Sequence, residues 1–319
     1  MTLTELRYIV ALARERHFGR AAERCFVSQP TLSVAVRKLE DELGVAIFER
    51  HRGEVRATPV GRRIIEQAQR VLSEAQTVED IAREGRDELE GPLRLGAIYT
   101  VGPYLLPHLI PELRERAPHM PLVIEENFTA ELARQLRQNE LDAVIVAEPF
   151  ADPGVTSAAL YDEPFVVVMP RDHPWVRRKR ISANDLAGEK LLLLGPGHCF
   201  RDQVLEACPD CRDTEIEGHK PLAGSSLETI RHMVASGLGI TVLPQGALGE
   251  GDGDSGLLAV RRFAPPAPSR RIVLAWRRSF PRPKAINVLR EAILTCRLGG
   301  INPVAARAPD TAAAPPVAP

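Results

Sequence analysis

The chain has 319 residues, 44% of them hydrophobic, and a net charge of -1, which is typical of a globular protein with two or three domains. Charged residues interrupt the N-terminus early and no run approaches the roughly 18 apolar residues of a membrane-spanning helix, so we expect a cytoplasmic protein with no membrane partner. In that compartment five cysteines do not indicate a disulfide framework, and we interpret Cys25 and Cys296, which lie among apolar neighbours, as packing residues.

Three helices are predicted at the N-terminus. Residues 3–16 carry apolar side chains on one helical face, and a second short helix is expected over residues 20–25. Ser28 then provides an N-cap, Pro30 occupies the first turn of the third helix, and Gly44 ends that helix. Two helices joined by a tight turn, with small and polar residues early in the second, are typical of a helix-turn-helix that enters the major groove of DNA.

The third helix and the hairpin after it offer candidate DNA contacts. On the polar face of the helix, Gln29, Ser33 and Arg37 can reach base edges, and Pro30 lies beside them. The hairpin can bind phosphates as a wing through Arg50, Arg52 and Arg56. The alternative is an ordinary solvated helix face.

A long helix is predicted from Pro59 to about Leu89, before Gly91 and Pro92 end it. Its apolar residues alternate by four and three, as in a coiled coil. They are Ile64, Ala68, Val71, Ala75, Val78 and Ala82. This helix is expected to dimerise the chain, and the alternative is a helix packed on its own domain.

From residue 93 onward, short β-rich runs alternate with helices, which favours parallel α/β units. The expected strands are 93–97, 122–125, 141–147, 165–169, 191–194, 239–243 and 271–276, and the expected helices are 102–116, 129–139, 227–236 and 283–298. Residues 249–256 are expected to form a surface loop without the spacing of a calcium site, and the Ala- and Pro-rich C-terminus a disordered tail.

The stretch 191–211 contains the residues best suited to chemistry. A short buried strand and a Gly-Pro-Gly turn precede a predicted helix whose N-terminus carries Cys199. The positive end of the helix dipole favours a thiolate, and His198 and Arg201 can each bring positive charge close by. We therefore predict a reactive Cys199, whereas the alternative is an ordinary buried cysteine.

Cys208 lies nine residues after Cys199. Along an α-helix this separation is about 13 Å, whereas a disulfide needs its two Cα atoms within roughly 7 Å. A bond between these cysteines would therefore require the helix to unfold, and the pair would be a two-state switch.

Two other interpretations of this stretch are weaker. The Gly-Pro-Gly turn resembles the start of a dinucleotide fingerprint, but Phe200 stands in place of the third glycine. A zinc site would need a second tight cysteine pair, which is missing from the four candidate ligands His198, Cys199, Cys208 and Cys211. We expect no cofactor and no metal.

The N-terminal region resembles the winged helix-turn-helix of the LysR-type transcriptional regulators in residues 18–22, 27–33, 38–44 and 48–50. The resemblance extends over the later region. It implies an α/β protein in which the winged helix-turn-helix and a long linker helix precede two Rossmann-like subdomains of the periplasmic-binding-protein type. The expected boundaries are 1–58 for the DNA-binding domain, 59–90 for the dimerisation helix, 91–162 with 269–298 for the first subdomain, 163–268 for the second, and 299–319 for the tail.

Within this family, residues 197–203 together with Cys208 are similar to members that sense hydrogen peroxide, as are residues 98–107 and 172–175. The resemblance implies that peroxide oxidises Cys199 and that a disulfide with Cys208 then refolds the regulatory region and changes its DNA contacts. The implied peroxide site includes Thr100, Thr129, His198, Arg201 and Asp202. Cys211 does not belong to the family pattern.

Physical chemistry supports several of these roles. Thr100 and Thr129 follow the first and second strands, at the sheet edge where ligands bind in such folds. A hydroxyl there can donate to the leaving oxygen of peroxide. Arg270 and Arg271, at the start of the last strand, can add positive potential near the thiolate.

The expected partners follow from the same resemblance. They are double-stranded promoter DNA, hydrogen peroxide, further copies of the chain as a homodimer and a tetramer made of two dimers, RNA polymerase, and a thiol reductant such as glutaredoxin or thioredoxin. Two alternatives are a LysR-type regulator that binds a small organic effector between the subdomains, and a thiol peroxidase. We disfavour the thiol peroxidase, since it would leave the helix-turn-helix without a role. We therefore expect that the chain is not an enzyme.

Overall fold

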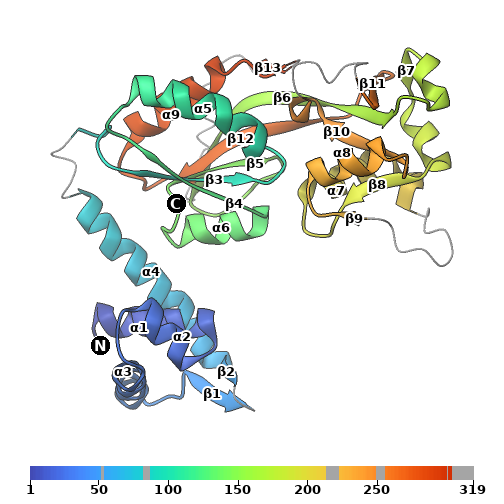
Figure 1. The fold of residues 1–319 in the computed structure, drawn as a ribbon. Coiled ribbons are helices and arrows are strands. Elements are labelled where there is room, and N and C mark those ends of the chain that lie inside the picture. Colours follow the sequence, from blue (N-terminus) through green and yellow to red (C-terminus); the bar gives the residue numbers. More distant parts are fainter. Residues whose placement is uncertain (52–53, 82–86, 213–222, 249–255, 300, 304–319) are drawn as a thin grey trace, which may run out of the picture. The chain divides into compact units, whose positions relative to one another are not determined.

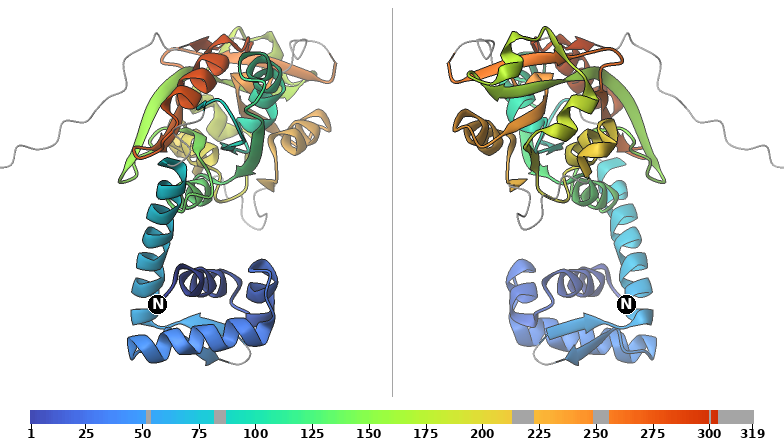
Figure 2. Two further views of the ribbon diagram at one scale, coloured as in Figure 1. Left: turned by 90° about the vertical axis from the view of Figure 1, so that its left-hand side faces the viewer. Right: turned by 90° about the vertical axis from the view of Figure 1, so that its right-hand side faces the viewer.

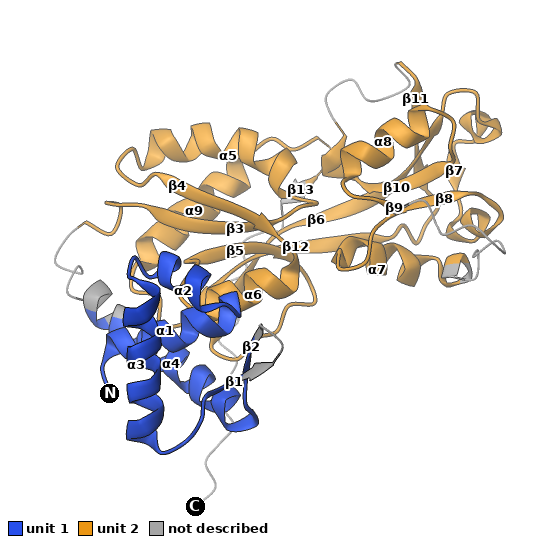
Figure 3. Ribbon diagram, turned by 60° about the horizontal axis from the view of Figure 1, so that its bottom comes forward, with its two compact units in different colours: residues 1–85 blue, residues 86–319 orange. Residues whose placement is uncertain are grey.

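The computed structural model describes residues 1–319 except 52–53, 82–86, 213–222, 249–255, 300 and 304–319. The chain divides into two compact units, residues 1–85 and 86–319 (Figure 3). No helix in the described ranges is long and apolar enough to cross a membrane. The predicted loop at 249–256 lies almost entirely outside the described residues, as does most of the predicted tail.

Unit 1 is a small helical domain with a β-hairpin (Figure 2). Its elements are α1 (Leu3–Glu15), α2 (Phe18–Arg24), α3 (Gln29–Leu43), β1 (Phe48–His51), β2 (Glu54–Ala57) and α4 (Pro59–Ile81). The caps predicted for α3 are confirmed, because Ser28 Oγ accepts from Thr31 N at 3.3 Å and Gly44 ends the helix with a φ of 67°. Helix α2 begins earlier than predicted because the His17 side chain caps it.

The first part of α4 packs on the core of unit 1. Ala68 is buried in that core, and Ile64 and Val71 are packed partly against it. Val78, further along the helix, is 67% exposed. The alternative interpretation, packing on the helix's own domain, is therefore correct for the first half of the apolar stripe.

Helix α4 is shorter than predicted. The structure describes it as far as Ile81, and it does not reach Leu89, which lies in a turn and packs against a core of unit 2. The Glu88 carbonyl oxygen accepts from Arg282 Nε at 2.7 Å, and its carboxylate accepts from the backbone N–H of Lys284 at 2.6 Å. The prediction of a helix to Leu89 is wrong because these contacts hold the segment against unit 2.

The first half of unit 2 is a sheet covered by helices on both faces (Figure 1). Its parallel strands are β3 (Leu93–Ile98), β4 (Leu122–Asn127) and β5 (Ala143–Ala147). Helices α5 (Gly102–Arg116) and α9 (Pro283–Thr295) lie on one face and α6 (Thr129–Arg137) on the other (Figure 1). The apolar side chains between these layers form the first core.

The second half has its own core, built on β8 (Leu191–Leu194), which pairs in parallel with β10 (Ile240–Pro244). Helices α7 (Cys199–Ala207) and α8 (Leu227–Ala235) pack here. The remaining strands are β7 (Arg180–Ile181), β9 (Ala223–Gly224) and β11 (Leu258–Phe263), and the 3-10 helices are η1 (Pro174–Arg177), η2 (Ala183–Gly188), η3 (Pro209–Arg212) and η4 (Gln245–Ala247).

Two long antiparallel strands join the halves. Strand β6 (Val155–Pro170) pairs with β12 (Ser269–Arg277) in the first half and with β10 and β11 in the second. The sequence predicted only 165–169 as a strand, because only that part of β6 is a continuous run of apolar residues, all of them buried. The expectation of purely parallel units is wrong for these pairings, as it is for β5 with β12. Pro303, within the predicted tail, belongs to the short strand β13 (Asn302–Pro303), which pairs with β6.

Candidate functional site

The turn before α7 sets the position of Cys199. Strand β8 is followed by Gly197, whose φ of 96° is a conformation that favours glycine. A Cβ atom on this residue would lie 3.2 Å from the Phe128 ring, so the backbone approaches that ring closely. Helix α7 then starts at Cys199, and Phe200 and Val204 bury its apolar face in the second core. The predicted strand, turn and helix are confirmed.

Cys199 lies between the two cores. Its helix is anchored in the second core, but the half-buried Cys199 side chain packs against the first. As the first residue of α7, whose start has no side-chain cap, it lies at the positive end of the helix dipole. The predicted position of Cys199 at the start of a helix is confirmed.

His198 does not supply the predicted positive charge. It is 8% exposed, and its ring packs edge-on against Phe128 at 4.8 Å and Tyr99 at 5.9 Å. Burial lowers the pKa of His198 below its ordinary value of 6.5, so the imidazole is neutral at neutral pH. A neutral imidazole can donate or accept a hydrogen bond beside Cys199, but it adds no charge.

The buried cation beside α7 is Arg270. Its guanidinium lies 5.0 Å from the centre of the Phe200 ring and donates to Glu163 at 2.7 Å. It also donates to the Oγ1 of Thr100 at 2.7 Å and to the carbonyl oxygen of the same residue at 2.9 Å. Since the Thr100 hydroxyl accepts from this cation, its own hydrogen remains available to another acceptor. Arg271, by contrast, is exposed and pairs with Asp162 at 2.7 Å, so its charge is already partnered at the surface.

Thr129 is the first residue of α6, and its buried Oγ1 has no hydrogen-bond partner in the described part of the chain. The Glu126 Oε1 atom is likewise buried and unpartnered, and burial raises the pKa of this carboxyl. A Cβ on Gly102 would fall 2.0 Å from that oxygen, so the Glu126 carboxylate keeps this position only beside a glycine. The sequence analysis missed Glu126, whose only signal was its position at the end of a strand beside Thr129.

Two other predicted residues point elsewhere. The Arg201 guanidinium donates to the Leu194 carbonyl at the end of β8, at 3.0 Å. Asp202, in the first turn of α7, is exposed. Gln203, which was not predicted, donates to the Glu148 carbonyl oxygen at 3.1 Å and so links α7 to the first half of unit 2.

A cavity of about 680 Å³ adjoins this face of α7. Its walls come from α7, the segment after β5 and the start of β12, and include Gln203, Glu206, Ala207, Phe150 and Arg270. Cys199 precedes Gln203 by one helical turn, so it lies on the same face of the helix as the cavity.

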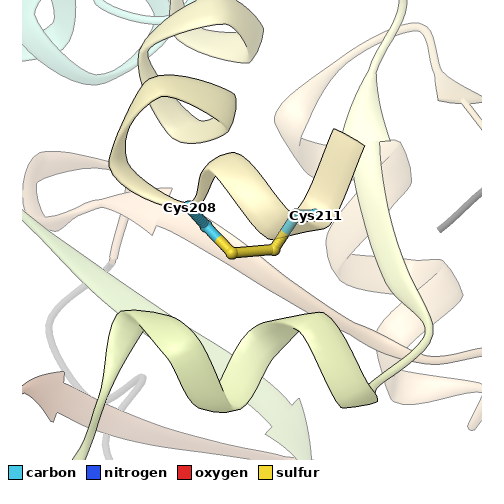
Figure 4. The surroundings of a disulfide bond; sticks show 2 residues. All are labelled: Cys208 and Cys211. Carbon is cyan, nitrogen blue, oxygen red and sulfur yellow. A yellow bond between two sulfur atoms is a disulfide. The ribbon is translucent and has the colours of Figure 1, made fainter. Parts of the chain in front are cut away.

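Cys208 is bonded to Cys211 (Figure 4). The sequence analysis did not predict this disulfide, and its expectation that the thiols remain reduced is wrong for this pair. The bond also occupies two of the four sulfur and nitrogen groups considered as zinc ligands. Cys199, Cys25 and Cys296 are free thiols. Cys296 is a packing residue as predicted, because its thiol donates to the Ala292 carbonyl at 3.2 Å and burial raises its pKa to about 11.

The predicted DNA-contacting side chains of α3 face solvent. Gln29, Pro30 and Arg37 are exposed, and Ser33 is partly exposed. In the wing, Arg56 is exposed, whereas Arg52 and the side chain of Arg50 lie outside the described residues. Val34, on the same face of α3, is 68% exposed as expected for that face, whereas the exposed Phe26 in the turn before α3, at 96%, was not predicted.

Comparison with known proteins gives consistent results for both units. The sequence matches the bacterial regulatory helix-turn-helix family of lysR type over residues 3–62 and the LysR substrate binding domain over residues 86–295. It is 42% identical over 293 residues to the DNA-binding transcriptional dual regulator OxyR of Escherichia coli K12, covering 92% of this chain and 95% of that protein.

Solved structures are similar over nearly the whole chain. A full-length OxyR from Pseudomonas aeruginosa, carrying aspartate in place of a cysteine, is 58% identical with a TM-score of 0.74, over 93% of this chain and 99% of that one. A Corynebacterium glutamicum OxyR with serine in place of a cysteine and hydrogen peroxide bound is 33% identical with a TM-score of 0.61, over 92% of each chain.

Proposed function

We propose that Cys199 is the residue that hydrogen peroxide oxidises in this chain. The chain belongs to the LysR family of transcriptional regulators, and within it to the OxyR regulators of the hydrogen peroxide response. The observation that carries this proposal is the position of Cys199. It begins α7 at the junction of two cores, one residue from Phe200, against which the buried Arg270 guanidinium packs. The start of a helix and a nearby buried cation are the surroundings in which reactive cysteines are found.

The reaction begins with attack of the Cys199 thiolate on one peroxide oxygen. The O–O bond breaks, the sulfur becomes a sulfenic acid, and the leaving hydroxide takes a proton to become water. The Thr100 hydroxyl, which accepts from Arg270, can donate to that leaving oxygen, and the unpartnered Thr129 hydroxyl is a second donor. The neutral His198 imidazole and the Arg201 guanidinium are the other polar groups close to Cys199 in the sequence. We assign the exposed Asp202 a smaller role in the oxidation step.

The sulfenic acid then condenses with the thiol of Cys208 and releases water. Because these residues occupy the two ends of α7, the disulfide forms only after the helix unwinds. Unwinding removes Phe200 and Val204 from the second core and breaks the contact of Gln203 with Glu148. The chemical event is thereby converted into a change between the two halves of unit 2.

Unit 1 carries the output of the switch. We assign promoter binding to the exposed face of α3 and to the wing, with Gln29, Ser33 and Arg37 at base edges. Pairing of two chains through the exposed part of α4, and of two dimers into a tetramer, would place recognition helices on separate half-sites. RNA polymerase and a thiol reductant such as glutaredoxin or thioredoxin complete the proposed partners. Peroxide consumption is stoichiometric in this scheme, so the chain is not an enzyme.

Replacement of Cys199 by serine tests the proposal. The Cys199→Ser chain should bind promoter DNA with unchanged affinity but show no peroxide-dependent change in transcription or footprint, and a sulfenic-acid probe should no longer label it. Cys25→Ser, which alters a free cysteine in unit 1, is the matched control and should respond normally. Full induction of the Cys199→Ser chain would exclude Cys199 as the sensor.

The cavity beside α7 supports a second candidate function. A space of about 680 Å³ whose walls include arginine, glutamine and glutamate side chains can hold a small polar organic molecule, as expected for a regulator that responds to an effector. Calorimetric titration with small carboxylates would detect such binding. In that case thiol substitutions would leave induction unchanged.

A further inference from the structure

Cys208 is shared between two disulfides that exclude one another. The proposed function, on which this inference rests, bonds it to Cys199, whereas the structure bonds it to Cys211 and leaves Cys199 free. A sulfur atom forms only one disulfide at a time, so each bond prevents the other.

The two bonds have opposite effects on α7. Cys208 caps the end of this helix, and its N–H donates to the Val204 carbonyl oxygen at 3.0 Å. Cys211 lies in the next turn, with its N–H donating to the Cys208 carbonyl oxygen at 3.1 Å and a Cα–Cα distance of 5.5 Å. The bond between Cys208 and Cys211 therefore closes beyond the helix and leaves α7 folded, while the bond to Cys199 requires α7 to unwind.

The folded helix also keeps apolar side chains buried. Cys208 and Cys211 are 1% and 5% exposed, and both lie in the second core with Phe200 and Val204. Exchange from the helix-breaking disulfide to the helix-preserving one returns these side chains to the core. Burial of these side chains thus favours the bond between Cys208 and Cys211 over the bond between Cys199 and Cys208.

We propose that Cys211 ends the peroxide signal by displacing Cys199 from Cys208. The Cys211 thiolate attacks the Cys208 sulfur of the disulfide with Cys199, a new bond forms between Cys208 and Cys211, and the electron pair of the broken bond leaves on Cys199 as its thiolate. No electrons are gained or lost in this exchange. The oxidising equivalent of peroxide remains in the disulfide shown in Figure 4, while α7 refolds.

The bond between Cys208 and Cys211 also leaves the chain unable to respond to further peroxide. While Cys208 is bonded to Cys211 it has no thiol, so a second exposure to peroxide oxidises Cys199 only to the sulfenic acid and α7 stays folded. A dithiol reductant supplies the two electrons and two protons that reopen the pair. The chain then responds to peroxide again.

A single-turnover experiment on the full-length chain tests the exchange. The fully reduced chain receives one equivalent of hydrogen peroxide, samples are acid-quenched and alkylated over time, and peptide mass mapping identifies each disulfide. A footprint on a promoter fragment is taken from the same samples. The bond between Cys199 and Cys208 should appear first and then decay as the bond between Cys208 and Cys211 grows, with the footprint reverting although no reductant is added.

The variants isolate the role of Cys211. In Cys211→Ala the first disulfide and the altered footprint should persist at least tenfold longer than in the unmodified chain. Cys296→Ala, which removes a free thiol that packs on the first core, should behave like the unmodified chain. Because Cys211 is buried, circular dichroism of the reduced variants checks folding, and Cys211→Ser is the second variant if the alanine variant is unstable.

Three results would overturn the inference. The first disulfide could decay equally fast in Cys211→Ala, it could persist in the unmodified chain, or mapping could find Cys199 bonded to Cys211. The proposed function fails separately, if Cys199→Ser still changes its footprint with peroxide. A silent Cys199→Ser together with an unaltered Cys211→Ala would remove only the exchange.

Discussion

Val204→Ala is expected to accelerate formation of the disulfide between Cys199 and Cys208. Val204 is 1% exposed and fastens α7 to the second core. Loss of two buried methyl groups, at ~0.8 kcal/mol each, together with the cavity left behind, destabilises the folded helix by about 2 kcal/mol. If α7 opens before the sulfurs meet, this free energy raises the population of the open helix, and hence the rate, up to about 30-fold.

The assay follows the disulfide in chains that carry Cys211→Ala, so that the product accumulates. Samples are quenched and alkylated after one equivalent of peroxide, and the bonded peptides are quantified by mass spectrometry. Val234→Ala is the matched control, because Val234 is buried in the same core but belongs to α8. Both variants should lower the free energy of unfolding similarly, and only Val204→Ala should speed the reaction. Equal rates in the two variants would refute the requirement for α7 to open.

Three further predictions concern other parts of the chain. Because burial lowers the pKa of His198, the unfolded chain binds more protons than the folded one as pH falls below about 6.5, so stability should decrease on acidification. Denaturant titrations should show a weaker pH dependence in the His198→Asn chain. The control His108→Asn, at an exposed site, should keep the pH dependence of the unmodified chain. Arg270→Met should lower the free energy of unfolding by about 3–5 kcal/mol, because it leaves the buried Glu163 carboxylate without its partner. Arg271→Met, at an exposed ion pair, should change the free energy of unfolding by less than about 1 kcal/mol. Equal losses in the two variants would contradict this assignment of a buried and an exposed ion pair. Gln29→Ala should reduce discrimination at one operator base pair by about 1–3 kcal/mol in binding titrations with altered sites, and unchanged discrimination at every position would remove this residue from the base-reading set.

Local signals were sufficient to predict most of the elements. The N-cap of Ser28, the end of α3 at Gly44 and the helix that begins at Cys199 depend on neighbouring residues, and the structure confirms them. The end of the long helix depends on distant contacts of Glu88 with Arg282, which no local pattern contains. That is why the helix was predicted too long.

The sequence supplied candidate residues for the site but not their charge states. Family resemblance brought Thr100, His198 and Cys199 together, but His198 is neutral because Phe128 and Tyr99 bury it, which its sequence neighbours do not indicate. Glu126 was missed because its burial depends on the approach of another segment. Such tertiary effects decide charge states even where the sequence identifies the residues.

The disulfide between Cys208 and Cys211 illustrates the same limit. Their spacing permits a bond within one turn, but it equally permits two thiols or a metal pair. The structure alone distinguishes these possibilities, and it thereby adds a third cysteine to the proposed switch.

Hydrogen exchange over α7 tests the central claim most directly. In the Cys211→Ala chain, the backbone amides of residues 199–207 should be protected when the thiols are reduced and should lose that protection once mass mapping finds Cys199 bonded to Cys208. The amides of α8 (Leu227–Ala235) should remain protected in both samples. A complete disulfide with undiminished protection over α7 would contradict the account.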